Sequence, residues 1–571
     1  MKLIYKEVKS LQRGMYLYYP QGCNRTAFKR CSITVLRDED DEESVLNLLF
    51  KTGLAELSER EQIILSFPNP VNHCWNSNFS KEAEDDIKAF SVFQDAMTKA
   101  DDNPLEFHPN GFPTDEAMMS TWHPMNDTKY LIGLGSGANM ACTLAACAPD
   151  NIAAVLCLEG GLCKEALEHA VYSVMPAFLV NCRQESVDYF VKADAAELVD
   201  ENMEGKLYQN LVNPLQCVME TRRDGKFDKE ILNMAWERLF YKVRRSNTGP
   251  HGDCEPRMDF RKAGFEIFLD DDRLEEKVKT PHTWFTYVPE LVKKDPKLKV
   301  PLMVFFHGGS DNPAEAAEMS KFHELGEREG FITVYPWGTN RASWNSNMEK
   351  DGADDVGFAV ALIRYMIANY PVDPERVYLS GFSNGAAHAQ VVALTHPELI
   401  AAICHIDSNW PGKRVGPTKV VYEEITPFRL ALEKKKQFDY RIPVWYTYGS
   451  REPSYPVYNG CSQQNQYDFW KLYNNIEIVP TPEQEHPHPC GCGVPGEKYE
   501  LLAPSKRHPH HQYDVQRFYA KDGERQNLYN YVLMRDKGHD IAEKDPELGW
   551  NYVKQFRRLP DGHLGFVKEG D

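Results

Sequence analysis

The chain lacks the features that would place it in a membrane or on nucleic acid. It has no uninterrupted apolar run of about 18 residues, the length that a membrane-spanning helix needs. Its first residues, Met1–Lys9, are interrupted by charges and contain no apolar signal-peptide core, which predicts a cytoplasmic protein. It has no excess of positive charge either. The formal net charge is -19, which disfavours nucleic acid and anionic membranes as partners.

Low-complexity tracts and a disulfide framework are also missing. Hydrophobic residues make up 42% of the 571 residues, which is typical of globular proteins, and this length exceeds what one core can organise. We therefore expect several domains. Most of the 14 cysteines lie within apolar patterns, where a reduced thiol packs as a small hydrophobe. Examples are Cys142, Cys147, Cys157, Cys182 and Cys404.

An internal repeat is present instead. The stretch Tyr130–Ala141 matches Tyr378–Ala389, which begins 248 residues later. Further matches in the same order pair Ala148–Val155 with His396–Ile403, and Trp75–Asn78 with Trp344–Asn347. So many collinear matches indicate a tandem duplication. We expect one domain over residues 1–250 and a second over residues 260–571, joined by a Gly- and Pro-rich linker at Ser246–Asp259.

The second copy contains the strand, sharp turn and helix of a nucleophile elbow. An apolar strand at Arg376–Leu379 leads through Gly381-Phe-Ser-Asn-Gly385 into a helix of small residues that begins near Ala386. The nucleophile of such an elbow has a strained backbone that leaves no room for side chains at the flanking positions, which explains the glycines. Ser383 is therefore the candidate nucleophile.

A glycine-rich loop follows an earlier core strand. Lys299–Phe306 is a nearly continuous apolar run, typical of a buried parallel strand, and His307-Gly-Gly-Ser-Asp311 comes directly after it. Backbone N–H groups of such a loop can face the site. We therefore expect Gly309, or Ser310 in its place, and Asn384 to donate hydrogen bonds to an oxyanion.

The acid and the base are expected after later strands. Glu452 follows the strand Ile442–Ser450, where an acid that orients the catalytic histidine is expected. Asp407, which follows the preceding strand, is the alternative acid. His539 lies on a glycine-marked loop after the strand Asn527–Met534, and imidazole is suited to proton transfer near neutral pH.

The first copy has lost the nucleophile and the oxyanion loop. At the position of Ser383 it has Gly135, and the neighbouring Ser136 matches Asn384 instead. In place of the glycine-rich loop it has Arg37–Asp41, whose carboxylates would repel an oxyanion. We therefore expect the first domain to be non-catalytic.

The base is missing from the first copy as well. Lys226 stands where the second copy has His539, although acids remain at both candidate positions, as Glu159 and Glu185. The motif Trp75–Asn78 is retained although the chemistry is lost. Its counterpart in the second copy is therefore interpreted as scaffold.

Residues 454–512 are expected to form a lid-like insertion between acid and base. Its aromatic residues fit an acyl pocket or ordinary core packing equally well: Tyr455, Tyr458, Phe469, Trp470 and Tyr473. Histidines and cysteines cluster in His486–Cys492 and His508–His511, but without the C-x2-C spacing of a structural zinc site. We expect no metal or other cofactor for the function, and metal binding by this insertion is left open.

Taken together, the motifs of the second copy resemble the polyhydroxybutyrate depolymerase and feruloyl esterase group of α/β-hydrolases, related to carbohydrate esterase family 1. The resemblance spans roughly residues 260–571 and rests on His307-Gly-Gly, Trp344-Asn, Asp354-Asp-Val-Gly-Phe358, Gly381-Phe-Ser-Asn-Gly385, Gly449-Ser-Arg-Glu-Pro453 and Gly538-His539. It implies two tandem α/β-hydrolase domains with mostly parallel sheets. The family usually has aspartate at the position of Glu452, and its polymer-degrading members are secreted.

The resemblance also implies a function, the hydrolysis of carboxylic esters through an acyl-serine intermediate. We expect small acyl or aryl esters of the feruloyl, acetyl-sugar or hydroxyalkanoate type, with His307 and Trp344 on the substrate side of the site. A serine peptidase, an acyltransferase of the same fold and a non-catalytic ligand-binding protein are the alternatives. The first copy is expected to be an internal pseudo-dimer partner, and a homo-oligomer is left open.

Overall fold

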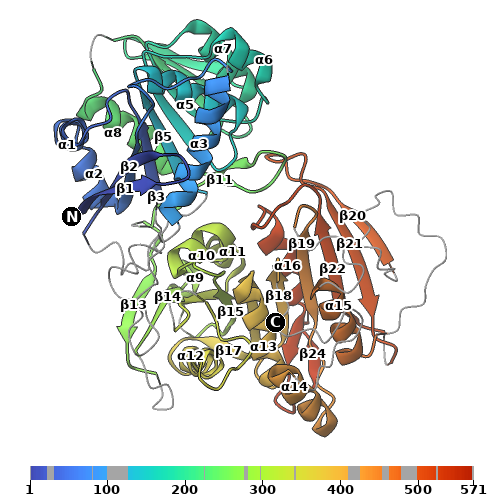
Figure 1. Cartoon of the computed structure of the whole chain (residues 1–571). Helices are drawn as coiled ribbons and strands as arrows, with labels where there is room; N and C mark the ends of the chain where they lie inside the picture. Colours follow the sequence, from blue (N-terminus) through green and yellow to red (C-terminus); the bar gives the residue numbers. More distant parts are fainter. Residues whose placement is uncertain are drawn as a thin grey trace. The chain divides into compact units, whose positions relative to one another are not determined.

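The chain divides into two units, residues Met1–Met258 and Asp259–Asp571, in the computed structural model. The structure describes residues 2–21, 31–79, 81–98, 127–223, 226–260, 262–274, 281–295, 297–339, 343–408, 425–452, 462–476, 498–522 and 525–568. The unit boundary falls at the end of the expected linker, which contains the second strand of a small hairpin, β11 (Val243–Ser246) and β12 (Asp253–Pro256). Figure 1 shows a sheet flanked by helices in each unit.

The first unit is built on one ten-stranded sheet. Its strands, in spatial order, are β1 (Lys2–Val8), β2 (Arg13–Tyr19), β4 (Ile63–Pro68), β3 (Cys31–Leu36), β5 (Lys129–Leu134), β6 (Ala154–Leu158), β7 (Ala177–Val180), β10 (Cys217–Thr221), β9 (Gly205–Gln209) and β8 (Glu197–Asn202). The six strands from β4 to β10 run parallel, and the two at each edge are antiparallel.

Helices cover both faces of this first sheet. One core cluster contains residues of α3 (Lys81–Thr98), α5 (Ser136–Cys147), α6 (Lys164–His169) and α7 (Gln184–Ala193). A second cluster contains residues of α1 (Glu42–Lys51), α2 (Leu54–Glu61) and α8 (Lys229–Arg238). The central strands are therefore buried on both faces, which explains their continuous apolar runs.

The second unit repeats this sheet strand for strand. Its spatial order is β13 (Glu266–Asp271), β14 (His282–Tyr287), β16 (Ile332–Pro336), β15 (Val300–Phe306), β17 (Val372–Phe382), β18 (Ala402–Ile406), β19 (Val444–Gly449), β22 (Asn527–Met534), β21 (Tyr513–Tyr519) and β20 (Lys498–Leu502). Parallel and antiparallel pairs occur at the same places as in the first sheet. The prediction of two tandem α/β-hydrolase domains is confirmed.

The helices of the second unit follow in the order α9 (Glu290–Lys294), α10 (Pro313–Ser320), α11 (Phe322–Glu329), α12 (Asp355–Asn369), α13 (Asn384–Thr395), α14 (Thr426–Gln437), α15 (Ser462–Tyr473) and α16 (Asp545–Val553), before the hairpin β23 (Phe556–Arg558) and β24 (Leu564–Phe566). The main core cluster contains residues of α12, α13, α14 and α15. No described helix of the chain has the length and apolar character needed to cross a membrane.

The described part of residues 454–512 is built into this fold. Phe469, Trp470 and Tyr473 lie on α15 and belong to the main core, and the Trp470 indole N–H donates to Gln390 Oε1 at 2.9 Å. The strand β20 forms the sheet edge, and the first unit has an equivalent helix and edge strand in α7 and β8. Core packing therefore explains these three aromatic residues. Tyr455, Tyr458 and His486–Cys492 lie outside the described residues.

No cysteine among the described residues is joined in a disulfide. Cys142, Cys157, Cys182 and Cys404 are buried, and Cys147 is half-buried. They pack as small apolar side chains, as expected.

Candidate active site

Ser383 lies at a sharp turn between β17 and α13. Its backbone has φ 52° and ψ -116°, a left-handed conformation that costs a non-glycine residue about 1–3 kcal/mol. The Ser383 N–H donates to the carbonyl of Ile406 on the neighbouring strand at 3.0 Å. The sheet therefore fixes the turn, which has the shape of a nucleophile elbow.

The two glycines of the turn are required by close backbone contacts. A Cβ on Gly385 would lie 2.2 Å from the Phe306 carbonyl oxygen and 2.3 Å from that of His307. A Cβ on Gly381 would lie 2.6 Å from the Gly385 backbone. These distances are shorter than van der Waals contact, so any other residue at these positions would push α13 away from the sheet.

His539 and Glu452 form a hydrogen-bonded pair. Like Ser383, they lie at the carboxyl ends of parallel strands. They follow β22 and β19, which are neighbouring parallel strands. The distance from His539 Nδ1 to Glu452 Oε1 is 2.7 Å, and the carboxylate is buried whereas 39% of the imidazole side chain is exposed. Because Nδ1 is engaged by the carboxylate, Nε2 is the nitrogen that is left to accept a proton.

The imidazole ring also lies next to the elbow. Its centroid is 4.7 Å from that of Phe382, the residue that precedes Ser383. The structure thus brings the candidate base to the turn that carries the candidate nucleophile. The catalytic roles of Ser383, Glu452 and His539 remain predictions.

Asp407, the alternative acid, has other partners. Its Oδ2 lies 3.2 Å from the Lys537 ammonium and accepts the Asp540 N–H at 3.1 Å. Oxygen and nitrogen atoms of Asp407, Glu452 and His539 lie within 4.8 Å of one another, yet the hydrogen bond to Nδ1 comes from Glu452. The geometry therefore favours Glu452 as the orienting acid.

Sequence reasoning missed Lys537. Its ammonium is fully buried between Asp407 and Asp545, at 3.2 and 2.8 Å. Burial lowers the pKa of Lys537, but the two carboxylates outweigh burial and raise it above the ordinary value, so the side chain is charged. The Ala542 N–H also donates to Asp545 at 2.9 Å. The Lys537 ammonium thereby holds the loop that carries His539 in place. In the sequence, the only sign of this role is that Lys537 stands two residues before His539.

The acids around His539 make it more basic. Burial favours the neutral imidazole, but the hydrogen bond to Glu452 and the charges of Asp407 and Glu452 outweigh burial. The pKa of His539 therefore lies above its ordinary value. This is the expected direction for a base whose imidazolium form must be stabilised during a reaction.

Gly309 and Asn384 remain the predicted oxyanion donors. A Cβ on Gly309 would meet nothing within 4 Å, so the loop faces open space there. The Gly308 N–H is already bound to Asp311 Oδ2 at 3.0 Å, so Gly309, with Ser310 as its alternative, stays the predicted donor of this loop. Asn384 is the first residue of α13, and its N–H therefore has no acceptor within the helix.

His307 and Trp344 are buried and form internal hydrogen bonds at the loop His307–Asp311. Both are buried, with exposed fractions of 0% and 4%. The Trp344 indole N–H donates to the His307 carbonyl at 2.9 Å, and His307 Nε2 accepts the Gly338 N–H at 2.9 Å. Direct contact of these two residues with a substrate remains a prediction, because the bonds that the structure records are internal.

The first unit retains the elbow backbone, with glycine at the position of Ser383. Gly135 has φ 62° and ψ -129°, close to the values at Ser383. A Cβ on Gly135 would lie 2.2 Å from the Asp38 carboxylate, so a serine could not replace this glycine without displacing Asp38. The Ser136 N–H, the counterpart of the Asn384 N–H, donates to the two Asp38 carboxylate oxygens at 3.0 and 3.2 Å.

Asp38 therefore occupies the place that corresponds to the oxyanion position predicted for the second unit. The Ser136 hydroxyl also donates to this carboxylate. A carboxylate oxygen carries the negative charge that an oxyanion would carry, and a helix N-terminus stabilises such a charge. The first copy thus contains a pocket filled by its own side chain, and Lys226, at the expected position of the base, is exposed.

The retained tryptophan motif has the same bonds in both units. The Trp75 indole N–H donates to the Arg37 carbonyl at 2.9 Å, as the Trp344 indole does to His307. The Asn76 N–H donates to Asp86 at 2.8 Å, and the equivalent Asn345 N–H donates to Asp355 at the same distance. These bonds do the same structural work in both copies, which supports the scaffold interpretation.

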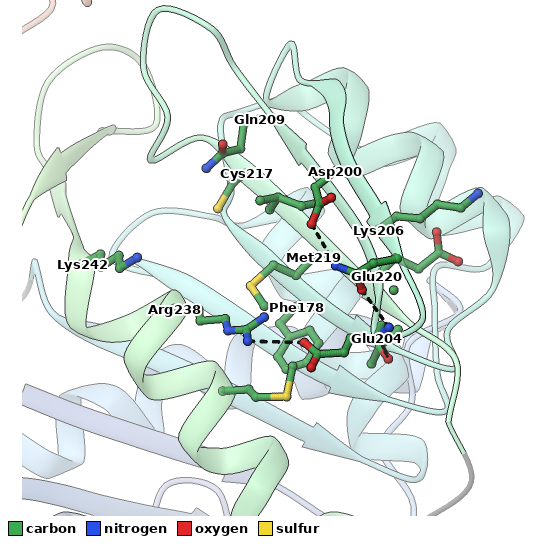
Figure 2. Close-up of a pocket in the computed structure, with 15 residues that line it drawn as sticks. Phe178, Asp200, Glu204, Lys206, Gln209, Cys217, Met219, Glu220, Arg238 and Lys242 are labelled. Carbon is green, nitrogen blue, oxygen red and sulfur yellow. Dashed lines mark hydrogen bonds and ion pairs between the residues drawn. The ribbon is translucent and has the colours of Figure 1, made fainter.

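A cavity in the first unit lies away from its elbow residues. Figure 2 shows its lining residues, which come mainly from β8, β9 and β10 and include Phe178, Met219 and the ion pair Arg238–Glu204. Burial raises the pKa of the Cys217 thiol in this cavity to about 12, so the thiol is protonated and unreactive. The cavity contains neither Gly135 nor Ser136.

Comparison with known proteins gives a match within the second unit. Residues 286–410 match the family described as Esterase PHB depolymerase. An acetylxylan esterase of Coprinopsis cinerea is 30% identical over 139 residues, which cover 23% of this chain and 35% of that protein. Feruloyl esterase B of Neurospora crassa is 32% identical over 126 residues, which cover 21% of this chain and 41% of that protein. The chain thus spans less than half the length of either relative.

Among solved structures, an acetyl xylan esterase from Aspergillus awamori covers 51% of this chain and 99% of its own, with a TM-score of 0.35 and 16% sequence identity.

Proposed function

We propose that the second unit, an α/β-hydrolase of the polyhydroxybutyrate depolymerase and feruloyl esterase type, hydrolyses carboxylic esters through an acyl-serine intermediate. The observation that carries the proposal is the hydrogen bond from His539 Nδ1 to the buried Glu452 carboxylate, beside the strained turn at Ser383. A nucleophile, a base and an orienting acid in this chain order are the parts that acyl transfer needs.

In the first step, His539 Nε2 accepts the hydroxyl proton of Ser383 as the oxygen attacks the ester carbonyl carbon. The carbonyl π electrons move to oxygen, and the N–H groups of Asn384 and Gly309 stabilise that oxyanion. When the tetrahedral intermediate collapses, the bond to the alcohol breaks and the imidazolium returns its proton to the leaving oxygen. A water molecule then repeats these steps on the acyl-enzyme and releases the acid.

The substrate class is inferred from the relatives. Two relatives of the second unit are named acetylxylan esterase and feruloyl esterase B. We therefore propose acetyl or feruloyl esters of a hydroxylated alcohol as substrates. We further propose that the first unit is non-catalytic, because Asp38 fills its anion pocket and Gly135 replaces the nucleophile.

Two serine substitutions in the full chain test this proposal. Ser383→Ala should reduce kcat for p-nitrophenyl acetate and for methyl ferulate by about 10⁴-fold or more, as loss of a catalytic serine does elsewhere. Ser136→Ala is the matched control, because this serine occupies the same turn of the first copy. It should leave both activities unchanged. Retention of wild-type turnover by Ser383→Ala would reject the proposal.

Further assays on the same protein preparation distinguish an esterase from a peptidase, an acyltransferase and a ligand-binding protein. Turnover of peptide substrates above that of the ester series would favour a peptidase, and transfer of the acyl group to added alcohols in preference to water would favour an acyltransferase. A protein that binds these esters without turning any of them over would be a ligand-binding protein.

A further inference from the structure

A group of three histidines lies between β20 and β21, at a distance in sequence from every residue of the proposed triad. The sequence there is His508-Pro-His-His511, in the stretch of the second unit that precedes Tyr513. His508 and His511 are buried, and His510 is exposed. The esterase chemistry proposed above uses none of them.

The three imidazoles face one another closely. The ring centroids of His508 and His511 are 4.5 Å apart and nearly parallel, with an interplanar angle of 14°. The His510 ring is 4.7 Å from His511 and 6.0 Å from His508, and it is nearly perpendicular to both. One ligand nitrogen from each ring lies within 4.8 Å of the others.

These nitrogens are close to the spacing that a metal ion requires. Zinc binds imidazole nitrogen at about 2.0–2.1 Å in a tetrahedral arrangement, which separates two ligand nitrogens by about 3.3 Å. Contraction by about 1.5 Å or less, through side-chain rotation, would therefore close the group around one ion. Uncharged imidazole is a preferred ligand of Zn²⁺, Co²⁺, Ni²⁺ and Cu²⁺.

The backbone already holds the loop in a closed turn. The His511 N–H donates to the His508 carbonyl at 3.1 Å, and the His508 N–H donates to Ser505 Oγ at 3.0 Å. The Ser505 hydroxyl in turn donates to the Glu543 carboxylate, which also lies 3.7 Å from Arg507. This carboxylate offsets the positive charge that precedes the histidines, and the turn reduces the entropy cost of bringing the ligands together.

We propose that His508, His510 and His511 form a binding site for a divalent transition-metal ion, with Zn²⁺ as the type ion. Three nitrogen ligands leave a fourth position for water or another oxygen ligand. The site is separate from the proposed esterase triad in sequence and in the residues it uses. The metal site takes no part in the proposed ester hydrolysis. Metal bound there stabilises the loop before β21.

Cobalt(II) titration of the full-length, metal-free protein tests this site directly. Co²⁺ takes the same ligands as Zn²⁺ and has visible absorption bands that report tetrahedral nitrogen coordination. We expect one saturable equivalent per chain, displaced by Zn²⁺. The variants His510→Ala and His511→Ala should each weaken binding by at least about 10- to 100-fold, the loss that even outer-shell substitutions cause at metal sites.

The matched control is His563→Ala. His563 is an exposed histidine of the same unit, but its ring packs on Phe438 and it does not belong to the three-histidine group. It should leave the cobalt affinity unchanged. His510→Gln keeps a polar side chain at the exposed position. It should fold like the wild type and still lose the metal, so it separates loss of a metal ligand from misfolding. Thermal unfolding of each variant without metal verifies that the comparison is between folded proteins.

Three results would overturn the proposal. One is the absence of a saturable cobalt equivalent in the wild type, and another is equal affinity in the wild type and in folded His510→Gln. A strong thiolate-to-cobalt charge-transfer band would assign the bound ion to cysteines instead. Because every readout is metal binding, failure here would leave the proposed esterase function untouched, and loss of esterase activity in Ser383→Ala would say nothing about the metal.

Discussion

The internal carboxylate of the first copy leads to a test of the oxyanion pocket in the second. Gly308 occupies the place of Asp38, because the preceding residues His307 and Arg37 accept the same tryptophan N–H bond. Gly308→Asp would therefore introduce into the active copy the side chain that fills the inactive one. We expect it to abolish esterase activity.

The size of the effect follows from two contributions. A carboxylate that accepts the Asn384 N–H, as Asp38 accepts the Ser136 N–H, removes one oxyanion donor, and such a loss costs about 10²- to 10³-fold in kcat. A second negative charge about 4 Å from the oxyanion adds about 4 kcal/mol at an effective dielectric constant of about 20, or about 10³-fold. Together the two reduce kcat by about 10⁵-fold or more.

Two further variants separate these contributions. Gly308→Asn keeps the shape and the hydrogen-bond acceptor but not the charge, so it should lose only about 10²- to 10³-fold. Gly308→Ala tests steric effects alone, because its Cβ would lie 2.6 Å from Asp311 Oδ2 and 2.8 Å from the Phe382 ring, both side-chain atoms that can shift. The assay is kcat for p-nitrophenyl acetate on proteins with native circular dichroism. If folded Gly308→Asp were as active as Gly308→Asn, the reasoning about the pocket would be wrong.

Three other predictions concern the loop that carries His539. The pKa of His539 lies above its usual value of about 6.5, and the neutral form is the base, so kcat/KM should rise with pH and level off only above that value. Glu452→Gln removes causes of that upward shift and should move this limb to lower pH. It should also reduce the plateau by up to about 10⁴-fold, whereas Asp407→Asn should reduce it far less. An unmoved limb in Glu452→Gln would contradict the pairing. Lys537→Met leaves two buried carboxylates unpaired and should lower the free energy of unfolding by about 3–5 kcal/mol in urea titrations. Because the Lys537 charge lowers the pKa of His539, this variant should also move the limb to higher pH, and a shift to lower pH would count against it.

The sequence predicted the fold because each core strand carries a strong local signal. Continuous apolar runs such as Val300–Phe306 identify strands that are buried on both faces, and the duplication doubles the evidence for their order. The elbow is also predictable, because its strand, its turn Gly381-Phe-Ser-Asn-Gly385 and its helix follow one another directly in the sequence. Local rules of this kind can be read without knowing the tertiary structure.

Other parts depend on contacts between distant residues and could not be predicted. Nothing local separates Glu452 from Asp407, because both are acids that follow strands of the same sheet, and only the bond to Nδ1 distinguishes them. The burial of Lys537 between two carboxylates is equally non-local. The sequence predicts α15 to be part of a lid-like insertion, because it lies in the long stretch between Glu452 and His539. Its place in the core depends on Trp470, which belongs to the main core cluster and donates a hydrogen bond to Gln390 on α13.

We propose that the chain has one working serine, in the second unit, and one blocked copy of the same site, in the first unit. Reaction of the full-length protein with excess fluorophosphonate, followed by intact-protein and peptide mass spectrometry, measures this directly. We predict one adduct per chain, located on Ser383, and no adduct in Ser383→Ala. An unmodified wild-type chain, or an adduct that persists on another serine when Ser383 is replaced, would contradict the account.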